Sequence, residues 1–266
     1  MIGVIGSGSG GLIVLKTLAE RLPHDDFTFV GNTARSPYGS KSAKTVTKYV
    51  LESADLVMQQ NARIVVIASH TASCVATDRL RAFLKVPVLD VVDPAVERAV
   101  QLSRSLRIGI IGDRTTIDSG TYQRKLGTAC PEAQIFSAAC PLLGSLVKEG
   151  WHKKSITRMI VKKYLHPLKR KQIDTLILGC THYPLLAPII QNKIGRRVNL
   201  IDPARPVSIK LADYLKSTPG IRERRPQIGR IRLFATDVTT ELERATQTIL
   251  GPKAHLQSLS ELTSEC

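Results

Sequence analysis

MIGVIGSGSGG, residues 1–11, is the stretch that decides the fold. A short apolar run at 2–5 leads directly into six residues that are only glycine and serine. This pattern is typical of a buried parallel strand that turns into a helix. Gly6, Gly8 and Gly11 also have the G-x-G-x-x-G spacing of a dinucleotide-binding turn. The stretch therefore predicts a β-α unit whose turn binds a ligand.

The sequence lacks the acidic residue that a dinucleotide-binding site needs besides the glycine turn. A dinucleotide-binding turn needs an acidic residue about 20 positions further on, at the end of the next strand, to hold the ribose hydroxyls. Here the next strand-like run, 27–30, ends in Gly31 and Asn32, and no P-loop Lys-Ser/Thr pair follows the glycines. What remains is a turn of N–H groups with Ser7 at a helix start, which suits a carboxylate.

Short apolar runs alternate with longer periodic segments along the chain, which predicts a mostly parallel α/β protein. We expect strands at 2–5, 27–30, 64–68, 86–91, 107–111, 175–179, 199–201 and 230–235. We expect helices at about 11–21, 42–60, 75–84, 94–104, 117–128, 155–170, 206–216 and 239–249.

Two loops of the first half have counterparts in the second half. IGVIGSGSG (2–10) resembles IGIIGDRTT (108–116), and IVVIASHTAS (64–73) resembles TLILGCTHYP (175–184). Two similar halves would place four polar loops at the carboxyl ends of parallel strands, the edge at which open α/β sheets bind ligands. We therefore predict two similar parallel-sheet α/β domains that face each other across a cleft.

The domain boundaries follow from the same repeat. We expect an N-terminal α/β domain at 1–96 with the first site loops and a C-terminal α/β domain at 97–208 with the Cys180 loop. The segment 209–266 is expected to return to the N-terminal domain. In this arrangement Ser69 and Cys180 lie on opposite walls of the cleft.

The charge balance is the unusual feature of the composition. The 266 residues include 38 Lys and Arg against 22 Asp and Glu, a net charge of +16 that would attract nucleic acid, an anionic membrane or small anionic substrates. The densest basic stretch, KKYLHPLKRK (162–171), has apolar residues at helical spacing and indicates an exposed helix face, while RERR (222–225) lies in a connector. Neither stretch matches a nucleic-acid-binding motif. Because of the net charge, a nucleic-acid partner still stays open as an alternative.

The cysteines and the apolar runs indicate the compartment. No paired spacing connects the five cysteines, Cys74, Cys130, Cys140, Cys180 and Cys266. No signal segment precedes the first strand, and no apolar run approaches the about 18 residues of a membrane span. We therefore expect a cytoplasmic protein with free thiols and no membrane partner. The histidines show no metal-ligand spacing, so no metal site is expected.

The loop after the strand at 175–179 carries side chains suited to acid-base chemistry. Cys180 ends the strand and His182 follows two residues later, so a thiol and an imidazole can share a proton. The alternative is a buried, inert cysteine. Ser69 occupies the corresponding place in the first half and is followed by His70. That pair suggests a hydrolase, but A-S-H-T-A is not the G-x-S-x-G of a nucleophile elbow.

Five stretches resemble the glutamate racemases of the aspartate/glutamate racemase superfamily: SPYGSKS (36–42), ASHTAS (68–73), GDRTTIDSGTYQR (112–124), ACPLLGSLVKEGW (139–151) and LGCTHYPLL (178–186). Their order and spacing match from Ile2 to about Gly251. The resemblance implies two α/β domains with the substrate between them, no cofactor and usually a homodimer. It also implies an isomerase in which one cysteine on each side of the α-carbon moves the proton, so that L- and D-glutamate interconvert for peptidoglycan synthesis.

By this resemblance, half of the catalytic machinery is present. Cys180 stands where the family has its second catalytic cysteine, and His182 and Glu149 stand where residues assist that thiol. The positions that would hold the amino acid are Ser7, Gly8, Tyr38, Gly39, His70, Thr71, Thr116, Thr181 and His182.

The other half departs from the family. Its D-S-G motif has Gly6 in place of the aspartate, and its first cysteine is replaced by Ser69. Asp113 stands where a substrate-contacting threonine is usual, and it would repel an anionic ligand unless Arg114 compensates. A serine hydroxyl has no thiolate-like fraction at neutral pH, and each ~1.4 kcal/mol of barrier is worth tenfold in rate. We therefore expect a degenerate active site.

Three functional hypotheses follow. The predicted function is a glutamate racemase-family enzyme, impaired or altered at Ser69 and Gly6, in which His70 with a near-neutral pKa replaces the missing thiol. The second is a one-base enzyme of the same superfamily that uses Cys180 alone. The third is a catalytically silent binding or regulatory homologue, whose charge of +16 would permit a nucleic-acid or acidic-protein partner.

Overall fold

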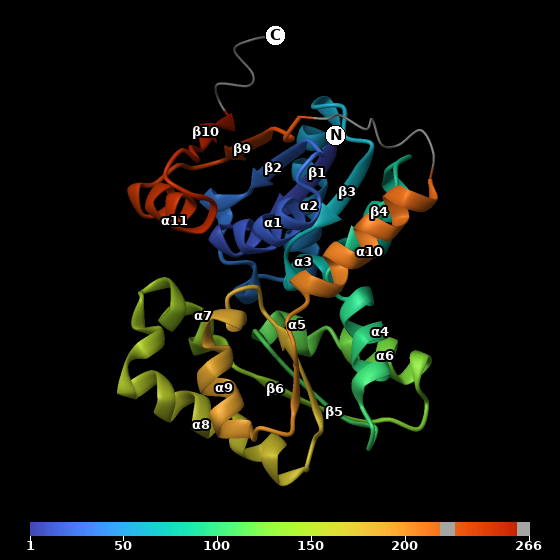
Figure 1. The fold of residues 1–266 in the computed structure, drawn as a ribbon, viewed down its shortest axis with the longest axis vertical. Coiled ribbons are helices and arrows are strands. Elements are labelled where there is room, and N and C mark those ends of the chain that lie inside the picture. Colours follow the sequence, from blue (N-terminus) through green and yellow to red (C-terminus); the bar gives the residue numbers. More distant parts are fainter. Residues whose placement is uncertain (219–226, 260–266) are drawn as a thin grey trace.

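Figure 1 shows the computed structural model of the chain, which describes residues 1–218 and 227–259. The RERR stretch and Cys266 lie outside these ranges. Within the described residues, no helix combines the length and the apolar character that crossing a membrane requires.

The first sheet has six strands that pair in parallel, in the order β10-β9-β2-β1-β3-β4. Its strands are β1 (Ile2–Gly6), β2 (Phe27–Gly31), β3 (Ile64–Ile67), β4 (Val88–Asp90), β9 (Ile231–Ala235) and β10 (Gln257–Ser258). β1, β2 and β3 are buried along their whole length, which explains their continuous apolar sequences. The opening stretch of the chain therefore lies at the centre of this sheet.

The second sheet has four parallel strands in the order β6-β5-β7-β8. They are β5 (Arg107–Gly112), β6 (Gln134–Ala139), β7 (Thr175–Gly179) and β8 (Asn199–Ile201). Figure 1 shows this sheet below the first, with helices on its two faces. The prediction of two parallel-sheet α/β domains across a cleft is confirmed.

The helices fill the connections between the strands. They are α1 (Ser9–Arg21), α2 (Ala43–Gln59), α3 (His70–Phe83), α4 (Asp93–Leu102), α5 (Arg114–Asp118), α6 (Thr121–Ala129), α7 (Pro141–Lys148), α8 (Ser155–Arg170), α9 (Ala187–Ile194), α10 (Ala204–Ser217) and α11 (Thr240–Leu250). Short 3-10 turns are η1 (Thr33–Arg35), η2 (Tyr38–Ser40), η3 (Trp151–Lys153) and η4 (Tyr183–Leu186).

Several elements differ from the expectations. The helix expected at 117–128 is divided into α5 and α6, because Gly120 between them has a φ of 66° that ends the helical path. β6, α7 and α9 were not expected. β6 is an edge strand with no fully buried residue, so its sequence lacks the continuous apolar run that marks its neighbours.

Two helices connect the sheets. Val92, at the start of α4, packs in one cluster with Ile108 and Ile110 of the second sheet. Val207 and Leu211 of α10 pack in another cluster with Leu15 of α1. β9 and β10 then return to the edge of the first sheet. The expected boundaries at 96/97 and 208/209 both fall inside a helix, and the three-part division stays a prediction.

Candidate active site

A cavity of about 290 Å³ lies between the two sheets. Strands β1, β3, β5 and β7 all point their carboxyl ends toward it, as expected for a ligand site in parallel α/β sheets. Most of the expected catalytic and substrate-binding residues line it: Ser7, Gly8, Tyr38, Gly39, Ser69, His70, Thr71, Cys180, Thr181 and His182. Ser69 and Cys180 therefore share one cavity, as the internal repeat predicts. Glu149 and Thr116 are not among the lining residues.

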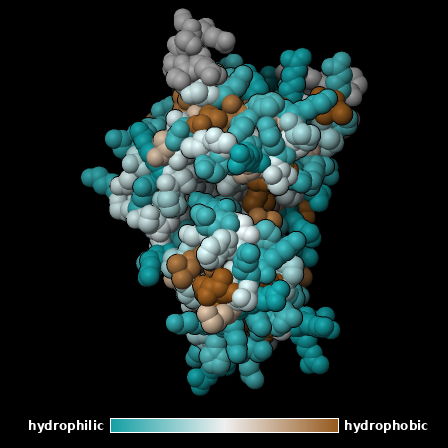
Figure 2. Space-filling model, turned by 90° about the vertical axis from the view of Figure 1, so that its left-hand side faces the viewer, coloured by the Kyte–Doolittle hydropathy of each residue, from teal (hydrophilic) through white to brown (hydrophobic). Residues whose placement is uncertain are grey.

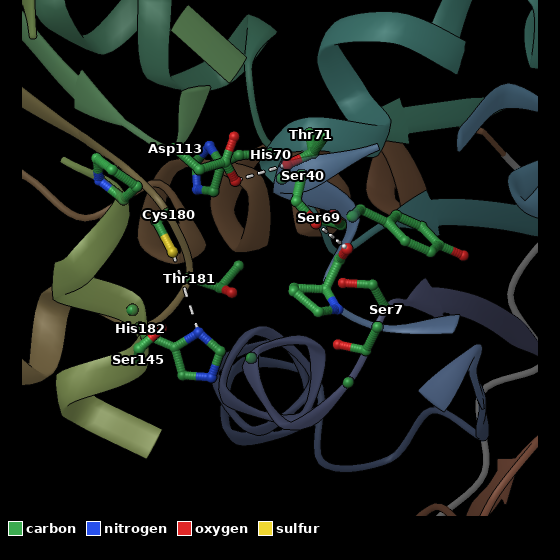
Figure 3. Close-up of a pocket in the computed structure, with 18 of the residues that line it drawn as sticks. Ser7, Ser40, Ser69, His70, Thr71, Asp113, Ser145, Cys180, Thr181 and His182 are labelled. Atoms are coloured by element: carbon green, nitrogen blue, oxygen red, sulfur yellow. Dashed lines mark hydrogen bonds between the residues drawn. The ribbon is translucent and has the colours of Figure 1, made fainter. Parts of the chain in front are cut away.

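Cys180 and His182 come from the loop that follows β7. The Sγ atom of Cys180 lies 4.0 Å from Nδ1 of His182, and Nε2 of the same ring lies 3.2 Å from Oγ of Ser9. Ser9 begins α1, so a residue of the first sheet's domain orients an imidazole of the second. Figure 3 shows Cys180, Thr181 and His182 on one side of the pocket and Ser7, Ser40 and Ser69 on the other.

Burial is the main cause of the shifted pKa values of Cys180 and His182. It raises the pKa of the Cys180 thiol to about 12, with a smaller rise from Asp113 and an opposing effect of Lys148. Burial, together with the positive charge of Lys148, lowers the pKa of His182 to about 4. At neutral pH the thiol therefore keeps its proton and the imidazole is neutral.

Ser69 has a structural role on the opposite wall. It is the N-cap of α3, and its Oγ accepts a hydrogen bond from the backbone N–H of Ala72 over 3.4 Å. Serine is among the best N-cap residues, because its hydroxyl satisfies an N–H that the helix leaves without a partner. The side chain that replaces a thiol here is therefore engaged with its own helix.

His70 lies beside Ser69 but is buried, at 3% exposure. Its Nδ1 lies 2.8 Å from the hydroxyl oxygen of Tyr122, and burial lowers its pKa to about 3. The expectation of a near-neutral pKa is therefore wrong, because the sequence did not reveal how deeply the ring is packed. A base of this strength is poorly matched to removing a carbon-bound proton near neutral pH.

The position of Gly6 has no room for a side chain. A Cβ atom on Gly6 would lie 2.8 Å from Cε2 of Phe29 and 3.2 Å from the Cα of Gly11. Phe29 is itself buried, at 1% exposure. The phenyl ring thus fills the space beside the turn, and the wall is packed without a carboxylate at position 6.

Asp113 is held by two threonines. Its Oδ2 accepts a hydrogen bond from Oγ1 of Thr71 over 2.8 Å, and its Oδ1 accepts one from the backbone N–H of Thr116 over 2.8 Å. Thr116 is fully buried and lies behind Thr71, 3.2 Å away between the hydroxyl oxygens. Thr116 therefore supports the wall, whereas Thr71 and Asp113 reach the cavity.

α7 presents a cation to the cavity where sequence reasoning expected an acid. Pro141, Gly144, Ser145 and Lys148 line the cavity at the i, i+3, i+4, i+7 spacing of one helix face. Glu149 follows the last helical residue and is exposed. Sequence reasoning missed Lys148: the helical spacing groups it with Pro141 and Gly144 on one face, but only the structure shows that this face meets the cavity.

The cavity combines hydroxyl groups with a net positive charge. Its hydroxyl-bearing lining residues are Ser7, Ser36, Tyr38, Ser40, Ser69, Thr71, Ser145, Thr181 and Tyr183. Its charged lining residues are Asp113, Arg114 and Lys148. The described residues contain no group of three His, Cys, Asp or Glu that could hold a metal ion. The arrangement suits a small polar anion that also carries one positive group.

The fold and this cavity define the class of the protein. The chain belongs to the Asp/Glu/Hydantoin racemase family, and the sequence model of that family matches residues 2–206. The expected membership of an amino-acid racemase family is thereby confirmed.

Within this class the chain is similar to glutamate racemases. It is 39% identical to that of Syntrophus aciditrophicus over 254 residues, which covers 94% of this chain and 92% of that protein. It is 40% identical to that of Aquifex aeolicus over 261 residues, 98% of each chain.

Solved structures of glutamate racemases show the same likeness. The glutamate racemase isoform of Bacillus anthracis superposes with a TM-score of 0.92, at 32% identity over 97% of each chain. That of Francisella tularensis, solved in complex with D-glutamate, gives a TM-score of 0.89 at 31% identity, over 97% of this chain and 95% of that one.

Proposed function

We propose that the protein acts on glutamate as a racemase-family enzyme with one acid-base thiol, Cys180, and that it exchanges the α-proton much faster than it racemises. The observation that carries this proposal is the unequal chemistry of the two walls. Cys180 and His182 form a thiol-imidazole pair on one side, while Ser69 on the other side caps a helix. The names of its relatives, glutamate racemases, support the choice of substrate.

The charges of the cavity complement those of glutamate. Glutamate at neutral pH carries two carboxylates and one ammonium group. The cavity has two cations, Arg114 and Lys148, and one anion, Asp113. The start of α1, next to Ser7, adds backbone N–H groups and the positive end of a helix dipole, which favour a carboxylate. In this proposal Asp113 faces the ammonium group and does not repel the ligand.

The chemical step begins at Cys180. Its proton passes to His182, which is uphill because the pKa of the thiol is about 12 and that of the imidazole about 4, so the thiolate is a minor species. That thiolate removes the proton from the α-carbon of the bound amino acid. The carbanion spreads its charge onto the α-carboxylate, which the cations and the α1 N-terminus stabilise. Cys180 now carries the α-proton, which exchanges with solvent by way of His182 before a proton returns to the α-carbon. The starting enantiomer is then restored with a solvent hydrogen.

Inversion needs a proton donor on the opposite face. There the proposal has the Ser69 hydroxyl, which is a far weaker acid than a thiol, and the neutral His70, which is committed to Tyr122. Each ~1.4 kcal/mol of added barrier slows the inversion tenfold relative to the exchange.

We further propose that the protein is a cytoplasmic homodimer and that the D-glutamate it forms supplies peptidoglycan synthesis, as its likeness to glutamate racemases implies.

The test follows two signals from one reaction. The purified protein is incubated in D2O with L-glutamate and, separately, with D-glutamate; NMR measures loss of the α-proton signal and circular dichroism measures racemisation. We expect exchange of one enantiomer to exceed racemisation by at least 100-fold. The C180S variant serves as the inactive control, and E149Q as the matched variant at an exposed position.

Each other outcome has a definite meaning. Equal rates of exchange and racemisation would reveal an effective second base and contradict the one-thiol proposal. Exchange that persists in C180S would exclude Cys180 as the base. No exchange with either enantiomer would favour the catalytically silent homologue. Light scattering of the same sample measures the oligomer, for which a homodimer has twice the 29.2 kDa of the chain.

A further inference from the structure

Helices α8 and α9 form a basic groove on the outer side of the second sheet. We define it by Arg158, Lys162, His166, Lys169 and Arg170 of α8 and Lys193 of α9. The residues line two adjoining hollows of about 580 and 370 Å³, which share Asn192 and Lys193. None of these residues lines the candidate active site, so the groove is separate from the proposed function.

The groove lies in the most basic part of the chain. Residues 151–198 contain eleven Lys and Arg but a single acidic residue, Asp174, and so carry well over half of the net charge of +16. Asp174 does not line the groove, and its carboxylate faces the loop at 103–105, where it accepts hydrogen bonds from Ser103 and from the backbone of Arg104 and Ser105.

Among the residues that the structure describes, no carboxylate forms an ion pair with a groove cation. In the described part of the chain, the ion pairs involve other residues, mostly of the first sheet's helices and of α6 and α10. Like charges at this density repel one another, and an external polyanion relieves the repulsion. The surface is therefore complementary to a chain of phosphates.

The shape of α8 favours one kind of polyanion. Its buried face, with Thr157, Val161 and Leu165, packs on the core. The opposite face along its 16 residues is open, and half of its exposed residues are Lys or Arg. In Figure 2, which views the side of the molecule where α8 lies, the lower end is covered mainly by hydrophilic side chains. The major groove of B-form DNA, about 12 Å wide, admits an α-helix.

Other polyanions fit less well. The major groove of duplex RNA is too deep and narrow for a helix. Single strands bind through stacking on aromatic side chains, and no Phe, Tyr or Trp lines the basic groove. A membrane surface needs large exposed apolar side chains among the cations. Met159 and Trp151 are exposed, at 60% and 47%, but lie outside the lining, where the apolar residues are Pro188 and the half-buried Ile189.

We propose that the basic groove docks duplex DNA through its phosphates, without base-specific contacts. Five Lys and Arg side chains line the groove, and each phosphate contact adds about −0.9 to the slope of log K against log salt concentration. The expected slope is about −4.5, so raising the salt from 50 to 200 mM weakens binding by about 500-fold.

The experiment measures fluorescence anisotropy of a labelled 30-base-pair DNA duplex with the full-length protein at 50 and 200 mM NaCl. The groove variant carries K162Q, K169Q and K193Q. The control variant carries K16Q, K48Q and K210Q, which remove the same charge from exposed positions on the first sheet's side. We expect the groove variant to reduce the salt slope by about 3 and to weaken binding at 50 mM at least 30-fold, and the control to stay within 3-fold.

Four results would overturn the proposal. One is absence of binding at 50 mM. Another is equal loss in the groove and control variants, which would mean attraction by net charge alone. A third is tighter binding of an RNA duplex of the same length. The last is binding of vesicles of 70% phosphatidylcholine and 30% phosphatidylglycerol, lost in the groove variant, by a protein that does not bind DNA. Glutamate α-proton exchange serves as the folding control, because the groove variant should keep the wild-type rate.

Discussion

The imidazole of His182 lies between two partners, with Nδ1 4.0 Å from the thiol of Cys180 and Nε2 3.2 Å from the hydroxyl of Ser9. Because Ser9 belongs to α1 and Cys180 follows β7, the relationship spans the cleft between the two sheets. Movement of one domain against the other would change the orientation of the imidazole that lies beside this thiol. The acid-base pair is thus assembled by the packing of two domains.

The first prediction concerns this pair. C180S should lower the rate of glutamate α-proton exchange at least 1000-fold, because the proton-carrying group is lost. H182N should lower it about 100-fold, in the range typical of general acid-base catalysis. S9A should lower it less, because it removes only the hydroxyl beside Nε2. NMR in D2O measures all three, and equal rates in S9A and H182N would argue against a proton-accepting role of His182.

The second prediction separates Lys148, the last residue of α7, from Glu149, which follows it. Lys148 lowers the pKa of Cys180, so K148Q should slow alkylation of this thiol by iodoacetamide at pH 8.5. Lys148 is also one of two cavity cations, so K148Q should raise the KM for glutamate about tenfold. E149Q is the matched control at the exposed neighbour and should change neither value. A larger effect of E149Q than of K148Q would contradict the geometry of α7.

The third prediction concerns the space beside Gly6. G6D should destabilise the protein by about 1–3 kcal/mol, because its Cβ would lie 2.8 Å from the ring of Phe29 in a packed interior. F29L should cost stability by itself but reduce the cost of G6D when the two are combined. Urea unfolding of the four proteins measures this coupling. Strictly additive effects would show that the ring is not the obstacle.

The fourth prediction concerns the cap of α3. S69A should reduce the free energy of unfolding by about 1 kcal/mol, because the N–H of Ala72 loses its acceptor. S69T should retain most of the stability, since threonine also caps helices. S69C should increase racemisation, because it places a thiol on the wall opposite Cys180. An unchanged racemisation rate in folded S69C would mean that a further group on this wall limits inversion.

The fifth prediction is a pH dependence of stability. Burial alone would raise the pKa of Asp174, but hydrogen bonds from Ser103, Ser105 and Arg104 outweigh it and lower the pKa to about 2. Because this folded-state pKa lies below the unfolded value of 3.8, the stabilisation is complete above about pH 4 and is lost toward pH 2. Solvent screening limits the effect to about 1 kcal/mol. Thermal unfolding between pH 2 and 6 should show a shallower acid dependence in D174N than in the wild-type protein.

Buried strands and amphipathic helices were predictable because their signals are local. The apolar run at 175–179 and the helical spacing at 155–170 coincide with β7 and α8 at both ends. The edge strand β6 was not predictable, since partly exposed residues give no continuous apolar run. α3 starts at His70, earlier than the expected 75, because Ser69 caps it by accepting a hydrogen bond from the N–H of Ala72. Serine is a preferred N-cap residue, so this start has a local signal in the sequence.

By itself, the sequence determined the α/β architecture, the family likeness and the set of loops that meet at the cleft, because strand burial and loop position follow from local pattern and repetition. Only the tertiary structure decided that Lys148 and not Glu149 reaches the cavity, because that depends on the rotation of α7 against the second sheet. Likewise, the low pKa of His70 and the filled space beside Gly6 arise from packing between distant residues, Tyr122 and Phe29, and no local pattern encodes that contact.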